Sequence, residues 1–202
     1  MLDVLIIGAG AAGMSCGLVL GSAKNRPYVI NKKIAIITHQ KTSHLQTALF
    51  NNVLGVFPGT TGASILESGK KQLKDLYPHI VQIENEKVGS IEMGSNYYEV
   101  ATNKNSYKAK IVIVAVGYTD LITIDGLEDY IEPHPRTEKE KNKLWLKNTN
   151  HLVAKNLYVA GTLAGWRSQF AMASGSGAHV ATDILTLWND GKHTKVHDKI
   201  NG

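Results

Sequence analysis

Six residues near the amino end constrain the fold of this chain most: Gly8-Ala9-Gly10-Ala11-Ala12-Gly13. They follow the apolar run DVLII at residues 3–7, which is typical of a buried parallel strand. Small and apolar residues at 11–23 predict a helix, and IAIIT at 34–38 predicts a second buried strand. A glycine-rich turn between a strand and a helix, with a second strand after it, is the context in which this motif binds a dinucleotide.

Each glycine of this turn has a separate physical use. Gly8 permits the tight turn, Gly10 lets the backbone approach a pyrophosphate, and Gly13 lets the helix pack closely on the strand. The helix then presents free N–H groups and a partial positive charge to the phosphates. We therefore expect Gly8, Gly10, Ala11, Ala12 and Gly13 to bind a pyrophosphate. The alternative is a glycine-rich turn without a ligand.

The composition bounds the remaining choices. A chain of 202 residues with 43% hydrophobic residues can bury one full core. The net charge of +5 suits an anionic cofactor without specifying one. Cys16 is the single cysteine, which excludes an internal disulfide and a thiolate metal site and fits a reducing compartment. No signal peptide and no run of about 18 apolar residues is present, so we expect a soluble cytoplasmic protein that binds neither membrane nor nucleic acid.

The other segments predict an α/β fold. Residues 63–76 and 168–188 have helical character, 80–109 alternate like an antiparallel meander, and 111–116 and 157–160 are buried strands. We predict a Rossmann-like three-layer domain over residues 1–190, with a parallel sheet and a small antiparallel β-meander. Residues 191–202 are expected to form a basic flexible tail.

The end of the second strand lacks a feature that this motif usually has. A dinucleotide-binding fold commonly carries Asp or Glu there to bind the adenosine ribose. Here Thr38 and His39 occupy the position, and no acidic residue occurs between Asp3 and Glu67. This arrangement fits either the 2′-phosphate of NADP or an FAD protein whose branch lacks the acid.

Two strand-ending turns decide between these readings. Ala115-Val116-Gly117 closes one apolar strand, and Ala160-Gly161-Thr162 closes the other and leads to Ser168-Gln169-Phe170 and a small-residue helix. With the glycine turn, the Phe57-Pro58-Gly59 turn and Glu86-Lys87-Val88, they make the chain resemble the FAD domain of the thioredoxin reductase-like flavoproteins, the pyridine nucleotide-disulfide oxidoreductases. A single-nucleotide Rossmann protein of another class is the alternative.

The resemblance implies FAD as the cofactor and assigns a role to each segment. It places 115–117 and Val88 near the adenine side, Gly161 and Thr162 at the pyrophosphate and ribityl chain, and Gln169 and Phe170 at the flavin pyrimidine edge. The loop with His44 and Gln46 would run along the isoalloxazine. The cofactor-binding residues so expected are Gly8, Gly10, Ala11, Ala12, Gly13, Thr38, His39, Gln46, Val88, Ala115, Val116, Gly117, Gly161, Thr162, Ser168, Gln169 and Phe170.

The chain departs from the family in three places. Thr162 replaces an Asp and Val116 replaces a Thr. Residues 127–155 stand where the family inserts an NADPH domain with a Cys-x-x-Cys pair, and this segment is shorter than the minimum of about 50 residues that a domain needs. Within it, residues 136–147 are expected to form a mixed-charge surface helix anchored by Trp145, either a simple bridge or a docking surface. The chain is therefore not expected to reduce disulfides.

These observations leave two functions open. The first is a minimal FAD-dependent oxidoreductase that transfers a hydride at flavin N5, with a separate electron-donor protein or NAD(P)H as its partner. The second is a non-catalytic FAD-binding or nucleotide-binding subunit or sensor. A homodimer is compatible with both. No residue is assigned a catalytic role, and no metal site is expected.

Overall fold

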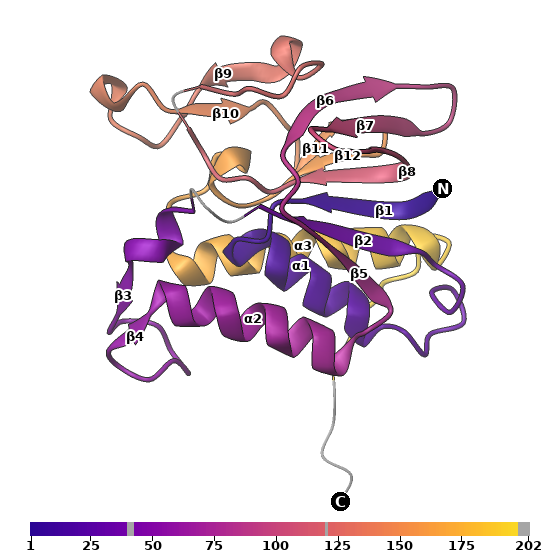
Figure 1. Cartoon of the computed structure of the whole chain (residues 1–202), viewed down its shortest axis with the longest axis horizontal. Helices are drawn as coiled ribbons and strands as arrows, with labels where there is room; N and C mark the ends of the chain where they lie inside the picture. Colours follow the sequence, from indigo (N-terminus) through magenta and orange to yellow (C-terminus); the bar gives the residue numbers. More distant parts are fainter. Residues whose placement is uncertain (40–42, 120, 198–202) are drawn as a thin grey trace, which may run out of the picture.

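The fold is a three-layer α/β domain, seen in a computed structural model that describes residues 1–39, 43–119 and 121–197 (Figure 1). Five parallel strands run in the order β12-β8-β1-β2-β5 through the middle layer. Their bounds are Leu157–Val159, Ser106–Val114, Leu2–Ile7, Ile34–Thr38 and Ile80–Glu84. Strand β11 (Leu152–Ala154) adds to β12 in the antiparallel sense. The predicted α/β class and parallel sheet are confirmed.

Helices cover one face of this sheet. These are α1 (Ala11–Ser22), α2 (Gly62–Leu76) and α3 (Phe170–Trp188), and Figure 1 shows all three on the same side. Because side chains alternate along a strand, Val4 and Ile6 of β1 pack toward the helices and Leu5 and Ile7 pack toward the other face. All four are buried, so two apolar clusters hold the three layers together.

The opposite face is covered by strands and loops (Figure 1). Strands β6 (Val88–Met93) and β7 (Tyr98–Thr102) form an antiparallel meander with the first half of β8. The expected boundaries were wrong here in two respects. Residues 80–84 belong to the parallel sheet instead of the meander, and one continuous strand spans 106–114. Strand β8 pairs with β7 through its first half and with β12 through its second half, so local turn signals did not reveal it.

The segment 127–155 contains no surface helix at residues 136–147, which corrects that prediction. It forms the hairpin of β9 (Ile131–Pro133) and β10 (Leu144–Leu146), with the short 3₁₀ helices η2 (Glu128–Tyr130) and η3 (Lys139–Lys141). Trp145 pairs with Glu132 across this hairpin. Cross-strand pairing and the full burial of Leu146 outweigh the helical charge pattern.

The loop between β2 and α2 contains η1 (His44–Thr47) and the small ladder of β3 (Leu49–Phe50) and β4 (Thr60–Thr61). At the other end of the chain, Thr194 is buried and its hydroxyl lies 3.2 Å from Asn189 Nδ2. Val196 packs against the helix-side cluster. Residues 198–202 lie outside the described part of the chain, and the flexible tail over 191–202 stays a prediction.

Candidate functional site: a cavity at the carboxyl ends of β1 and β8

A cavity of about 560 Å³ lies at the carboxyl ends of the parallel strands. Open α/β sheets bind ligands at this edge, and the volume lies within the range of small-molecule sites. The expected residues that line it are Gly8, Gly10, Ala11, Ala12, His39, Val88, Ala115, Val116, Gly117, Gly161, Thr162, Ser168 and Phe170. Four strand ends, two helix starts and one meander strand thus meet at one cavity.

Four expected residues do not line the cavity. Thr38 is buried, and its hydroxyl donates to the Ile83 carbonyl 3.2 Å away. Gly13 faces the Gly8 carbonyl, Gln46 is exposed in η1, and Gln169 is the exposed N-cap residue of α3. Their positions next to lining residues were predictable, but the direction of each side chain depends on tertiary contacts.

The three glycines of the motif occur at their positions for different structural reasons. A Cβ on Gly8 would lie 2.6 Å from the Ala115 carbonyl oxygen, and Gly8 has a φ of +101°. A Cβ on Gly13 would lie 1.8 Å from the Gly8 carbonyl oxygen. The fold therefore requires both glycines. Gly10 has a φ of −74°, and its Cβ would meet nothing within 4 Å. The fold does not require glycine there. The open space beside Gly10 is therefore space that a side chain would fill and that glycine leaves open.

Two helix amino ends reach this cavity. Neither the α1 N-cap, Gly10, nor the α3 N-cap, Gln169, makes a side-chain capping bond, and neither first turn contains an acidic residue. Amides of a helix first turn have no acceptor within the helix. Ala11 and Phe170, which begin these helices, line the cavity, so it receives two partial positive charges. This electrostatic arrangement favours an extended anionic ligand.

The turn after β12 is fixed by contacts from three directions. The Gly161 amide donates to Ser176 Oγ at 2.7 Å, and the Tyr118 amide donates to Thr162 Oγ1 at 2.9 Å. His134 Nε2 lies 2.9 Å from the Thr162 carbonyl oxygen, to which it can only donate. Burial, aided by nearby Arg136, lowers the pKa of His134 and so disfavours its charged form. The positive φ of Gly161, +78°, belongs to this turn.

Several lining residues were not expected from the sequence. They are Ser43, Leu45, Ala48 and Phe50 from the loop after β2, Tyr118, Thr119 and 121–124 after β8, and Lys143 before β10. His44 also lines the cavity, and the resemblance of its loop had implied a place beside the ligand. The ring centroids of Phe50 and Phe170 lie 5.0 Å apart. The centroid of the Tyr118 ring lies 5.9 Å from that of His44 and 5.4 Å from that of His134. The only signal for Tyr118 was its position directly after Gly117.

Glu86 lies in the cavity wall, but its carboxylate is already engaged. It accepts hydrogen bonds from Thr102 at 2.6 Å, Asn105 at 2.7 Å and Tyr107 at 2.9 Å. The Thr102 bond is the largest cause of a lowered Glu86 pKa, with burial opposing it. Glu86 therefore fixes the start of the meander, and it does not replace the acid that is missing after β2.

Comparison with known proteins places the chain in a family. The family model for pyridine nucleotide-disulphide oxidoreductases matches residues 2–165. The chain belongs to this family. An uncharacterized oxidoreductase of Bacillus velezensis, CzcO, is 21% identical over 194 residues, which cover 91% of this chain and 52% of that protein. A ferredoxin–NADP reductase of Pediococcus pentosaceus is 22% identical over 165 residues, which cover 80% of this chain and 47% of that protein. The chain thus spans about half the length of these curated relatives.

Solved structures agree on the fold of this family member. A putative thioredoxin reductase from Bacillus anthracis superposes with a TM-score of 0.70 at 16% identity, covering 94% of this chain and 99% of that one. Thioredoxin reductase from Lactococcus lactis gives a TM-score of 0.69 at 14% identity, covering 94% and 100%. At this identity the likeness establishes the fold alone. Within residues 1–39, 43–119 and 121–197, no helix is long and apolar enough to cross a membrane.

Proposed function

We propose that the cavity binds FAD and that the chain is the flavin-binding part of an oxidoreductase. The observation that carries this proposal is Gly10. Its φ of −74° is one that residues other than glycine adopt, a Cβ there would meet no atom within 4 Å, and this open space lies at a helix amino end without a side-chain cap. A ligand explains why this position has no side chain, whereas the fold does not. The residues present thus fit an anionic dinucleotide.

In this proposal the chain's residues divide into four groups. Gly10 and Ala11 receive the pyrophosphate, Val88 lies at the adenine side, and the turn at Gly161 and Thr162 receives the ribityl chain. The amino end of α3 at Phe170 stabilises negative charge on the flavin. When bound, the flavin supplies hydride transfer at its N5.

Thr162 can serve in place of the family's Asp. Its hydroxyl oxygen accepts the Tyr118 amide, which leaves the hydroxyl hydrogen free to donate to a ligand oxygen. A neutral hydrogen bond of this kind contributes about 0.5–1.5 kcal/mol, compared with about 1.5–3 kcal/mol for one that involves a charged group. We therefore expect weaker FAD binding than a family member with Asp would have.

We also propose that this chain does not itself exchange disulfides. Its one thiol, Cys16, is fully buried in α1, and burial raises the pKa of that thiol, so a thiolate does not form at neutral pH. Electrons would therefore pass to or from a free molecule, such as NAD(P)H, or a separate electron-donor protein.

The cofactor identity can be tested on the purified protein. Heat-released cofactor should run as FAD in chromatography, and apoprotein should regain flavin absorption when FAD is added. Release of NADP, or a persistent failure to bind FAD, would contradict the proposal.

The second candidate function is a flavoprotein subunit or sensor without catalysis, which the short segment 127–155 favours. Rapid mixing with NADH or NADPH under anaerobic conditions separates the two candidates. Prompt loss of the flavin absorption band at about 450 nm supports the oxidoreductase, since reduced flavin lacks this absorption. A flavin that binds but is reduced by neither nucleotide nor an added reductase protein supports the subunit.

A further inference from the structure

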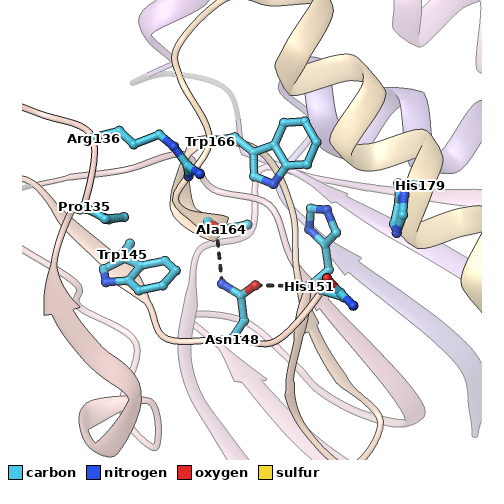
Figure 2. Close-up of a pocket in the computed structure, with 9 residues that line it drawn as sticks. Pro135, Arg136, Trp145, Asn148, His151, Ala164, Trp166 and His179 are labelled. Atoms are coloured by element: carbon cyan, nitrogen blue, oxygen red, sulfur yellow. Dashed lines mark hydrogen bonds between the residues drawn. The ribbon is translucent and has the colours of Figure 1, made fainter.

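A second cavity, of about 460 Å³, adjoins the turn after β12 at Ala164. Figure 2 shows it framed by side chains from the segment 135–151, from the η4 region (Gly161–Ala164 and the residues after it) and from α3. Its lining residues are Pro135, Arg136, Trp145, Asn148, Asn150, His151, Ala164, Trp166 and His179. None of these lines the first cavity, although η4 contributes Ala164 to the second cavity and Gly161 and Thr162 to the first.

The walls of the second cavity are aromatic. The Trp166 and His151 rings stack with their centroids 5.5 Å apart and an interplanar angle of 23°. Trp145 packs against the backbone of Gly165, where an added Cβ would lie 2.6 Å from Trp145 Cε3. Both indoles are therefore held in place by their neighbours, and flat aromatic walls favour a flat aromatic ligand.

Hydrogen bonds fix the base of this cavity. His151 Nδ1 lies 2.9 Å from the Val159 carbonyl oxygen, to which it donates, and the His151 amide donates to Asn148 Oδ1 at 3.0 Å. Asn148 Nδ2 in turn donates to the Ala164 carbonyl at 3.2 Å (Figure 2). Burial lowers the pKa of His151, which disfavours its charged form. These bonds pre-organise the site before a ligand arrives.

The charge of the lining is positive. Arg136 supplies a guanidinium, and no lining residue is a carboxylate. One Arg136 nitrogen donates to the Gly165 carbonyl, and a guanidinium has five N–H donors, so donors remain for a ligand. His179 Nε2 lies 3.3 Å from Asp183 Oδ2 on the same helix, and among residues 1–39, 43–119 and 121–197 no carboxylate forms an ion pair with Arg136.

From these observations we infer that the second cavity is a binding site for a planar aromatic compound with one anionic group, such as an aromatic carboxylate. The ring system lies between the indole walls, and the anionic group pairs with Arg136. This inference does not depend on the identity of the cofactor in the first cavity.

Calorimetric titration with 2-naphthoate and its neutral analogue 2-naphthamide tests the inference, with FAD in excess so that the first cavity is occupied. We expect one site per chain and at least tenfold tighter binding of the carboxylate. Arg136→Gln should abolish the preference for naphthoate. Arg167→Gln is the matched control, because Arg167 is exposed and lines neither cavity.

A second variant, Trp166→Leu, should weaken both compounds at least fivefold, and it stands as the test if Arg136→Gln does not fold by circular dichroism. The inference is overturned if naphthoate does not bind in a saturable way. It is also overturned if a folded Arg136→Gln keeps the wild-type preference, or if a folded Trp166→Leu binds both compounds as wild type does.

Discussion

The bond between Gly161 and Ser176 is the sharpest test of how the first cavity is built. Ser176 is fully buried on α3, and its hydroxyl accepts the Gly161 amide at 2.7 Å. Ser176→Ala removes this acceptor without changing the packing volume much. The buried Gly161 amide is then left without its observed partner.

The size of the effect follows from two opposing terms. A buried N–H that loses its acceptor costs about 1–3 kcal/mol. Alanine is the better helix former, which returns roughly 0.5 kcal/mol. We therefore expect a net loss of roughly 0.5–2.5 kcal/mol, and for a chain of this length each kcal/mol lowers Tm by about 2–4 °C. FAD affinity should fall with it, because the Gly161 turn becomes less fixed.

Thermal unfolding and FAD titration measure both effects. Ser68→Ala is the matched control: Ser68 is exposed on α2, and its hydroxyl bonds within its own helix to the Ile65 carbonyl at 3.2 Å. That control should change stability by less than about 0.5 kcal/mol. If Ser176→Ala unfolds at the same temperature as wild type and binds FAD equally well, the Gly161 bond does not hold the turn.

Four further predictions follow from individual positions. Gly10→Val should leave the Tm of the apoprotein within a degree or two of wild-type apoprotein, because its Cβ meets no atom within 4 Å, yet abolish FAD occupancy and with it the rise in Tm that FAD gives wild type; undiminished FAD absorption would place the ligand elsewhere. Gly177→Ala should destabilise by at least about 1–3 kcal/mol in denaturant unfolding, since its Cβ would lie 1.9 Å from the Ala12 carbonyl oxygen; an unchanged midpoint would contradict the helix contact. Thr162→Asp should keep or tighten FAD binding in a titration of apoprotein, and a tenfold loss would show that the turn does not meet the ribityl chain. The folded pKa of Glu86 lies below its unfolded value, so its contribution is present above about pH 4.3 and is lost as pH falls through the folded pKa. Glu86→Gln should thus have a lower free energy of unfolding than wild type at neutral pH, and this difference should disappear in acid. Denaturant unfolding at several pH values measures it, and a difference that does not change with pH would exclude this carboxylate as the cause.

Prediction from the sequence succeeded where the determinants are local. The strand, glycine turn and helix from Leu2 to Ser22 follow from apolar runs and glycine spacing, and the structure has them within one residue of the expected bounds. Prediction failed where pairing between distant segments decides. The helix expected at 136–147 gave way to pairing between β9 and β10, and β8 extends through a position where the sequence suggested a break.

The residues of the candidate site likewise divide into those that could be predicted from the sequence and those that could not. Residues that line the cavity through their backbone, such as Gly10 and Gly161, were predictable because glycine marks a close approach. Side-chain direction was not predictable: Thr38 turns to the Ile83 carbonyl, away from the cavity. Lys143 was missed for another reason, since it reaches the wall through the hairpin that the sequence did not reveal.

The segment 127–155 is more than a bridge between two halves of the domain. His134 contacts the Thr162 carbonyl, Arg136 contacts the Gly165 carbonyl, and Asn148 contacts the Ala164 carbonyl. Three side chains of this segment thus bind the turn after β12, and that turn lines the first cavity through Gly161 and Thr162 and the second through Ala164. In this chain the short segment itself holds the turn, so we expect the loss of one of these three side chains to alter both cavities.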